Sequence, residues 1–173
     1  MSKNYDYSYD WDIKYCYPHS SVLRNKFNIK NNEELKIAEI EYTSLSIAEI
    51  KDKPIKGDFN LKHLQNIHKH IFRDIYDWAG ELRTVNISKG TQFSNYIYII
   101  ENADKIFSEL KKDYYLIGMD MEDVNSKLAY YLSEINALHP FREGNGRAQR
   151  IIIEYLAEVA DRKSTRLNSS HIT

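Results

Sequence analysis

The segment LHPFREGNGRAQR, residues 138–150, places a histidine, a glycine-bracketed turn and two arginines between two helical patterns. Apolar residues recur every three or four positions on both sides of it, and Pro140 separates the two patterns. The same spacing occurs three more times nearer the N-terminus. These patterns predict an all-α fold in which the segment is the turn between the last two helices.

Five helices follow from the apolar spacing. The first is expected to begin at the capping-box-like pair Asn31 and Glu34, and the second to begin at Asn60 and end at Gly80. The expected helical stripes are, in order, Leu35, Ala38, Tyr42, Leu45 and Glu49; Leu61, Leu64, Ile67, Ile71, Ile75 and Trp78; Ile100, Ala103, Ile106, Phe107 and Leu110; Met121, Val124, Leu128, Leu132, Ile135 and Leu138; and Ala148, Ile151, Ile152, Tyr155, Leu156 and Val159.

Residues 81–98 lose the helical period. Two runs rich in β-branched and aromatic residues, LRTVNIS and NYIYI, flank Lys89, Gly90 and Thr91, an arrangement that is typical of a hairpin. We therefore expect a short β-hairpin from Ile87 to Tyr98 on an otherwise helical body.

Length and composition limit the function classes. A chain of 173 residues has the size of one domain, and its 42% hydrophobic residues argue against disorder along the whole chain. Lys and Arg number 24 against 25 Asp and Glu, so there is no global basic field for nonspecific nucleic-acid binding. The single cysteine, Cys16, cannot form an internal disulfide and no 18 consecutive residues are apolar, so we expect a soluble, cytoplasmic protein.

The two ends differ in composition from the expected domain, residues 31–160. Residues 1–30 are expected to form an irregular arm that packs aromatic side chains onto the domain, among them Tyr5, Tyr7, Tyr9, Trp11, Tyr15 and Tyr17. Residues 161–173 have no helical stripe and predict an unstructured tail. From Asp161 to His171 they resemble the translation of a common sequencing-adapter oligonucleotide, so we expect a non-native tail on a domain truncated at its C-terminus.

The turn at residues 144–146 has the chemistry of a phosphate site. Unpaired backbone N–H groups at a helix start attract anions, and glycines let a phosphate approach closely. Arg147 and Arg150 are one helical turn apart and can hold successive phosphates. Glu143 is placed to hold Mg²⁺, which commonly bridges phosphates to one carboxylate, and Asn145 can donate to a phosphate oxygen.

His139 precedes this turn and can take a proton from an incoming hydroxyl, which predicts attack on a nucleotide phosphate. Phe141 is expected to anchor the loop in the core, while Arg142 and Gln149 are expected to be solvated. Taken singly, a Gly-Asn-Gly turn, surface arginines and one histidine are all common structural features. Their convergence in one segment favours a functional site.

The segment resembles the Fic family signature, His-Pro-Phe-x-(Asp/Glu)-Gly-Asn-Gly-Arg-x-x-Arg, at every fixed position. The likeness extends over residues 17–160 and includes Tyr17-Pro18, residues 75–83 and Asn136-Ala137-Leu138. The resemblance implies AMP transfer from ATP to a hydroxyl of a target protein, with His139 as general base and Glu143 binding Mg²⁺. It assigns the phosphates to Gly144, Asn145, Gly146, Arg147 and Arg150, with the two arginines on the β- and γ-phosphates.

The same resemblance makes residues 87–98 a flap that aligns a target segment by strand addition. Ser88, Lys89 and Gly90 would lie near the nucleotide, and Ile87, Thr91 and Phe93 would align the target. One departure is His19, where many relatives have glycine after Tyr-Pro.

Several alternatives stay open. Relatives that transfer the terminal phosphate carry lysine where this chain has Gly146, which favours nucleotidyl transfer, but donors other than ATP are not excluded. A catalytically impaired, truncated binding module is a further alternative. A zinc site at His63, His68 and His70 is disfavoured because their spacings place them on different helix faces.

Family members are restrained by a helix carrying Ser/Thr-x-x-x-Glu-(Gly/Asn), whose glutamate pairs with the arginine equivalent to Arg150. No Ser or Thr of this sequence has Glu four residues later. We therefore expect a toxin restrained by a separate small antitoxin, or an inhibitory helix lost with the natural C-terminus. The resemblance to small toxins implies the ATPase subunits of gyrase and topoisomerase IV as targets.

Overall fold

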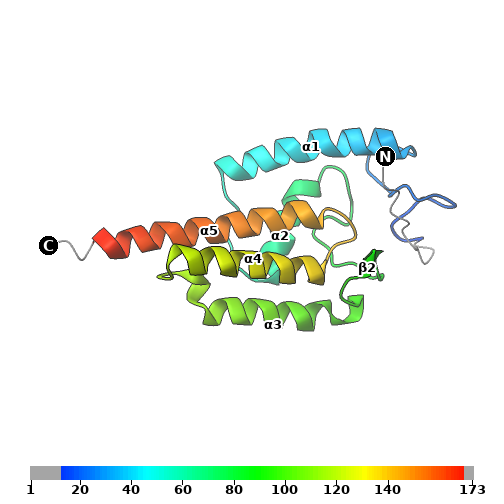
Figure 1. Ribbon diagram of the computed structural model, residues 1–173. Helices are drawn as coiled ribbons and strands as arrows, with labels where there is room; N and C mark the ends of the chain where they lie inside the picture. The colour runs from blue at the N-terminus through cyan, green and yellow to red at the C-terminus, as the bar shows by residue number, and fades with distance from the viewer. Residues whose placement is uncertain (1–12, 170–173) are drawn as a thin grey trace.

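The structure, a computed structural model, describes residues 13–169, and the side chains of residues 13–161 other than Thr91 (Figure 1). In these ranges the chain forms five α-helices, two short strands and two 3-10 helices. Their bounds are α1 Asn32–Asp52, α2 Leu61–Phe72, β1 Ser88–Lys89, β2 Thr91–Gln92, η1 Tyr96–Tyr98, α3 Ile99–Lys112, η2 Tyr114–Leu116, α4 Met121–Leu138 and α5 Asn145–Ser169. The all-α fold class predicted from the sequence is confirmed.

The helices pack around α2 and α5. Helix α2 contacts α1, α3 and α5, and α4 lies between α3 and α5. The turn that joins α4 to α5 is at the same end of the bundle as the β-hairpin, as Figure 1 shows. The core includes Leu64, Ile67, Ile71, Phe72, Ala103, Ile135, Phe141, Ala148, Ile152 and Leu156. Among residues 13–169, no helix has both the length and the apolarity that a membrane span requires.

Capping side chains define three helix starts. Asn31 accepts hydrogen bonds from the backbone N–H groups of Glu33 and Glu34, and Asn60 accepts from that of His63. Asp120 caps α4 in the same way. These bonds satisfy amide groups that have no acceptor inside the helix. The helix starts predicted at Asn31 and Asn60 are confirmed.

The inward face of α1 differs from the prediction. Its buried residues are Leu35, Thr43, Ser46 and Ile50. Tyr42 and Leu45, both expected in the stripe, are exposed, as are Ile37 and Ile40. The physical reason is that polar side chains of α1 bind groups of the neighbouring elements, which apolar periodicity does not register.

Helix α2 ends at Phe72 and not near Gly80, so its predicted end is wrong. The backbone N–H groups of Ile75 and Tyr76 both donate to the carbonyl of Phe72, which turns the chain out of the helix. This turn allows the rings of Tyr76 and Trp78 to stack with centroids 4.3 Å apart. The apolar residues after Phe72 are therefore buried by a turn and not by a longer helix.

The hairpin is shorter than predicted. Its antiparallel ladder pairs Ser88 with Gln92 and Lys89 with Thr91, and Gly90 has the positive φ of a tight turn. Residues 96–98, expected in the second strand, form the 3-10 helix η1 and lead directly into α3. The side chain of Asn95 accepts from the N–H of Ile97, and this cap overrides the β propensity of the sequence NYIYI.

The described part of the arm packs on the domain as expected. Tyr15 is 1% exposed and its ring meets Trp78 edge-on, with centroids 5.7 Å apart. Tyr5, Tyr7, Tyr9 and Trp11 lie outside the described residues. His19 has a φ of 57°, a left-handed conformation that glycine adopts more readily than other residues.

The expected break after Ala160 is absent. Helix α5 continues to Ser169, so the prediction of an unstructured tail is wrong for residues 161–169. This stretch contains neither glycine nor proline and includes good helix formers, so it prolongs a helix whose earlier turns are packed in the core.

Candidate active site

His139 is the residue that ends α4. Its backbone is left-handed, with a φ of 46°, and its N–H donates to the carbonyl of Ile135 at 3.1 Å. The ring atom Nδ1 lies 3.3 Å from the carbonyl oxygen of Asn136. Because a carbonyl only accepts, this contact places the proton on Nδ1 and leaves Nε2 with a lone pair. The ring is therefore held as a potential proton acceptor.

The surroundings of His139 keep its imidazole neutral. Burial is the main cause that lowers the pKa of His139 to about 4, and the positive charges of Lys89 and Arg83 lower it further. The Asn136 carbonyl and Glu143 act in the opposite direction. The ring of Phe93 stacks on the imidazole, with centroids 3.7 Å apart. At neutral pH the histidine is ready to accept a proton.

The motif loop, residues 139–146, is closed by the side chain of Asn145. Its Oδ1 accepts from the N–H of Phe141 and its Nδ2 donates to the carbonyl of the same residue, both at 2.8 Å. Asn145 is buried and both bonds of its side-chain amide go to the backbone of Phe141, so this amide holds the loop closed. Phe141 is fully buried, as predicted for the loop anchor.

The two glycines of the motif loop differ in their surroundings. Gly144 has a φ of 79°, and a Cβ there would lie 2.2 Å from the Phe72 ring, so packing alone demands glycine. At Gly146, apart from the chain neighbours and the backbone of α5, the nearest atom to such a Cβ is 4.0 Å away, on the Arg150 side chain. No neighbouring side chain in the described residues crowds Gly146, so the approach to the start of α5 is open. This is the geometry expected of an anion site at a helix N-terminus.

His68 of α2 binds the motif loop, a role that the sequence pattern did not predict. Its Nδ1 accepts from the N–H of Gly80 at 2.9 Å, so Nε2 carries the proton and donates to the carbonyl of Glu143, also at 2.9 Å. Its ring stacks on Phe141 with centroids 3.9 Å apart. Burial lowers the pKa of His68 to about 3, so the ring is neutral.

Arg83 joins the motif loop to the flap and was also missed as a functional residue. Its guanidinium donates to the carbonyl oxygens of His139 at 2.7 Å and Val85 at 2.6 Å, and also to that of Ser94. Burial lowers the pKa of Arg83 to about 10, so it stays protonated at neutral pH. The only signal in the sequence was its place in the stretch 75–83 that carries the resemblance.

The two motif arginines lie on the first turns of α5 in different environments. Arg150 is exposed, and its Nε donates to the carbonyl of Gly146 at 3.0 Å. Arg147 is half-buried and forms an ion pair with Glu39 of α1. Arg142, expected to be solvated, is buried with its guanidinium 5.9 Å from the centre of the Tyr15 ring, and Gln149 is half-buried.

Glu143 fits a magnesium site that phosphates would complete. Its Oε1 accepts from the N–H of Gly144 at 2.9 Å, which fixes the carboxylate beside the start of α5. One carboxylate is enough where phosphates and water supply the other ligands. In the described part of the chain, no group of three or more His, Cys, Asp or Glu could hold a metal alone. His63, His68 and His70 therefore do not come together as such a group.

The flap, residues 87–98, lies against the end of α4. Ile87 is buried and Lys89 and Gly90 are exposed. The N–H of Ser94 donates to the carbonyl of Ala137 at 3.0 Å, which pins the flap two residues before His139.

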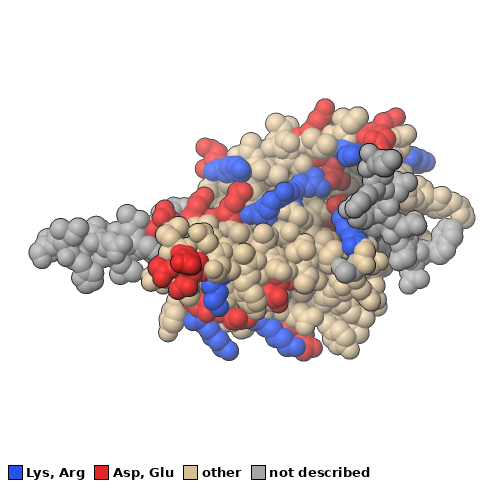
Figure 2. Space-filling view, viewed as in Figure 1, with Lys and Arg blue, Asp and Glu red and all other residues tan. Residues whose placement is uncertain are grey.

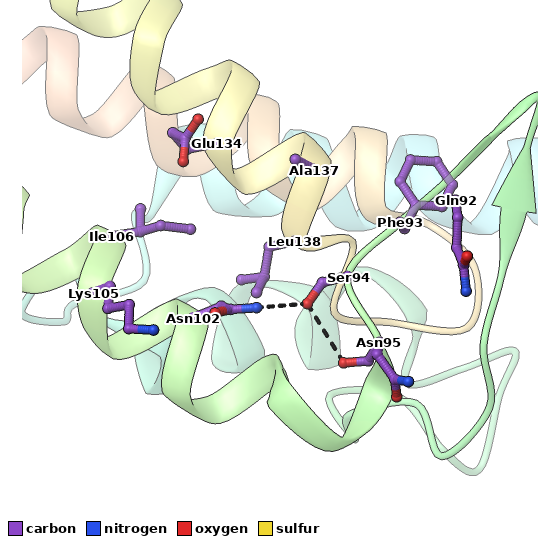
Figure 3. A pocket seen from close by; sticks show the side chains of 10 residues that line it. All are labelled: Gln92, Phe93, Ser94, Asn95, Asn102, Lys105, Ile106, Glu134, Ala137 and Leu138. Atoms are coloured by element: carbon purple, nitrogen blue, oxygen red, sulfur yellow. Dashed lines mark hydrogen bonds between the residues drawn. The ribbon is translucent and has the colours of Figure 1, made fainter.

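A pocket of about 410 Å³ lies between the flap, α3 and α4 (Figure 3). Asn102 donates to the hydroxyl of Ser94 in its wall. On the face drawn in Figure 2, basic and acidic side chains are interspersed, as the near-zero net charge predicts.

Comparison with known proteins assigns the chain to one family. The Fic/DOC family model matches residues 58–157, more than half of the chain, so the protein belongs to this family. The chain is 41% identical to the probable protein adenylyltransferase Fic of Escherichia coli K12, over 83% of this chain and 71% of that protein. It is 38% identical to the protein adenylyltransferase VbhT of Bartonella schoenbuchensis, over 84% of this chain and 31% of that protein.

A solved structure supports the same assignment. The N-terminal Fic domain of a VirB-translocated Bep effector protein of Bartonella quintana, solved with bound ADP, is 27% identical with a TM-score of 0.80. The similarity covers 86% of this chain and 77% of that one. The helical fold described above is thus the Fic fold.

Proposed function

We propose that the protein is an adenylyltransferase that transfers AMP from ATP to a hydroxyl side chain of a target protein. The observation that carries this proposal is the motif loop, where the neutral imidazole of His139 and the open start of α5 at Gly146 belong to one rigid turn. The names of its relatives, protein adenylyltransferases, support the same reaction.

The reaction follows from the positions of these groups. Nε2 of His139 takes the proton of the target hydroxyl, and the hydroxyl oxygen forms a bond to the α-phosphorus of ATP. The bond from the α-phosphorus to the oxygen that bridges to the β-phosphate breaks, and diphosphate leaves with the electron pair. The backbone N–H groups of Asn145 and Gly146 stabilise the charge on the α-phosphate, and Arg147 and Arg150 hold the departing phosphates.

Magnesium is assigned to Glu143. When bound, Mg²⁺ would neutralise charge on the phosphates and orient them. Glu143 has one oxygen committed to the N–H of Gly144 and a second to offer to the cation. The side chain of Asn145 keeps the loop closed, which leaves the phosphate contact of this residue to its backbone N–H.

The flap is assigned to the target. Ile87, Thr91 and Phe93 would align an extended target segment by strand addition, while Ser88, Lys89 and Gly90 would face the nucleotide. Phe93 supports this assignment because its ring stacks on His139, so a segment held along the flap would pass the proton acceptor.

The restraint of this activity is proposed to come from a separate small antitoxin. Within the 173 residues, no Ser or Thr has Glu four positions later, the spacing that an inhibitory helix of this family requires, so such a helix would have to dock from outside them. Arg150 is exposed and therefore accessible to a glutamate from another chain. Type II topoisomerase ATPase subunits are the first targets to try.

Labelled nucleotides test the reaction. The protein, Mg²⁺ and candidate targets are incubated with ATP labelled at the α- or at the γ-phosphate, and His139→Ala serves as the control. Label should pass to the target from the α-position and only with the native histidine. Transfer from the γ-position would indicate phosphoryl transfer, and transfer by His139→Ala would refute the assigned base.

A further inference from the structure

The inward face of α1 holds a motif arginine through two polar residues. Glu39 Oε1 accepts from Arg147 Nη2, and Thr43 Oγ1, one turn later, accepts from Nη1 at 3.2 Å. The Glu39 side chain is 14% exposed and that of Arg147 is 22% exposed, so water competes little for these bonds. The contact links α1 to the site across 108 residues of sequence.

Two further contacts fix the ion pair of Glu39 and Arg147. The Tyr76 hydroxyl donates to Glu39 Oε2 at 2.5 Å, which orients the carboxylate toward the arginine. Burial raises the pKa of Tyr76, and the negative charge of Glu39 raises it further, so the hydroxyl keeps its proton. The guanidinium carbon of Arg147 lies 4.7 Å from the centre of the Phe72 ring, the same ring that presses on Gly144. Arg147 and the motif loop therefore share one support.

A helix that only packs would bury apolar residues at these positions. On α1 the exposed side instead carries Ile37, Ile40 and Leu45, while Glu39 and Thr43 face inward. A buried ion pair contributes no more stability than well-packed apolar residues of similar size. The polar face is therefore better explained by the hydrogen bonds with which it holds the Arg147 guanidinium. A guanidinium has five N–H groups, so those not used by α1 remain for a phosphate.

We propose that Glu39, oriented by Tyr76, is a positioning residue that presets the guanidinium of Arg147 for the β-phosphate of the nucleotide. This inference rests on the proposed function, because it takes Arg147 as a phosphate ligand. It assigns to α1 a role in nucleotide binding. A glutamate that acts only as a structural ion pair, or as a competitor of the phosphate, would give different results in the following test.

The test compares ADP with AMP, because only ADP has a β-phosphate. Calorimetric titration with Mg²⁺ should show that Glu39→Gln weakens ADP binding roughly tenfold and changes AMP binding by less than about twofold. Glu41→Gln, on the exposed side of the same helix, should change neither affinity. Tyr76→Phe, which removes only the hydroxyl, should weaken ADP binding to a smaller extent and provides a second variant if Glu39→Gln does not fold.

A double variant shows whether Glu39 acts through Arg147. In an Arg147→Lys background, Glu39→Gln should produce no further change in the ratio of ADP to AMP affinity. The positioning role would be overturned if Glu39→Gln alone left the ratio of ADP to AMP affinity unchanged, or if it bound ADP more tightly. The proposed function would stand in either case, provided that the native protein binds the nucleotides. Failure of the native protein to bind either nucleotide would overturn both.

Discussion

The motif loop and the flap meet at His139 but are built in opposite ways. In the motif loop, Asn145 closes the turn from inside and His68 binds it from below, so its shape is determined by buried side chains. The flap has a ladder of two residues per strand, and Lys89 and Gly90 at its turn are exposed. It is attached to the helices through Arg83, the stack of Phe93 on His139, a backbone bond from Ser94, the bond from Asn102 to the Ser94 hydroxyl and the buried side chain of Ile87.

This difference matches the two tasks proposed for the regions. Groups that stabilise charge on a phosphate act best when they are fixed before the reaction, since reorganisation then costs nothing during it. A segment that pairs with different target sequences needs unoccupied backbone groups and little internal structure. Substitutions can test whether the two regions behave differently. Arg83 joins them, Asn145 and His68 hold the motif loop, and Phe93 belongs to the flap.

Replacing Arg83 should have the largest effect, because it belongs to both regions. Arg83→Met leaves the carbonyl oxygens of His139, Val85 and Ser94 without their donor. We expect a loss of about 3–5 kcal/mol in the free energy of unfolding, measured with urea. The matched control Arg73→Met, which removes an exposed ion pair with Glu49, should cost less than about 1 kcal/mol. Equal losses in the two variants would contradict the joining role.

Replacing Asn145 should affect the motif loop alone. Asn145→Ala removes both bonds to the backbone of Phe141 and leaves those buried groups unpaired, so we expect a loss of about 2–3 kcal/mol. Hydrogen exchange should speed up at the Phe141 amide and stay unchanged at the Phe93 amide, which is bonded within the flap to Ile87. Faster exchange at both amides would show that the loop and the flap open together. Asn125→Ala, at an exposed site on α4, is the control.

His68, which packs against the motif loop, should make the free energy of unfolding depend on pH. His68 has a pKa of about 3 in the folded protein, whereas an unfolded histidine titrates near 6.5. The unfolded state therefore binds more protons below pH 6.5, and the free energy of unfolding should fall by about 2 kcal/mol from this residue between pH 6.5 and 5. Urea unfolding of His68→Gln should show a smaller difference between pH 7 and 5 than the native protein. The same difference in both would refute the assignment, and His139, with a pKa of about 4, contributes with the same sign.

The smallest change in stability is expected from the flap. Phe93→Ala removes the ring that covers His139 and should cost less than about 1 kcal/mol, because Phe93 is only half-buried. Water then reaches the imidazole, so the pKa of His139 should rise from about 4 toward the ordinary value, as followed by NMR titration of its ring protons. An unchanged pKa would show that the bundle alone, without the flap, keeps the ring neutral.

Some of the site could be predicted because its residues are neighbours in sequence. His139, Glu143, Gly144 and Arg147 lie within one turn, and Pro140 and the glycines marked where the helices stop and start. Glu39, His68 and Arg83 could not be predicted in the same way. Glu39 reaches Arg147 from α1, while His68 and Arg83 reach the motif loop from α2 and from the segment after it, so no local spacing connects the three residues to the site.

The misread elements have a common cause. NYIYI was assigned to a strand by β propensity, but the cap from Asn95 starts a helix there. The inward face of α1 was assigned by apolar spacing, but a buried ion pair occupies it. In both cases one hydrogen bond or ion pair outweighed a preference summed over several residues.

The sequence by itself determined the helical fold class, the place of the motif loop and the residue types that are proposed to bind phosphate. These depend on apolar periodicity and on residues that are close along the chain, where local geometry is nearly the same in any fold. Only the tertiary structure decided that His139 is neutral, that Asn145 serves the loop and that Glu39 holds Arg147. Protonation and the choice of hydrogen-bond partner depend on burial and on contacts between distant segments, and these exist only after the helices have packed.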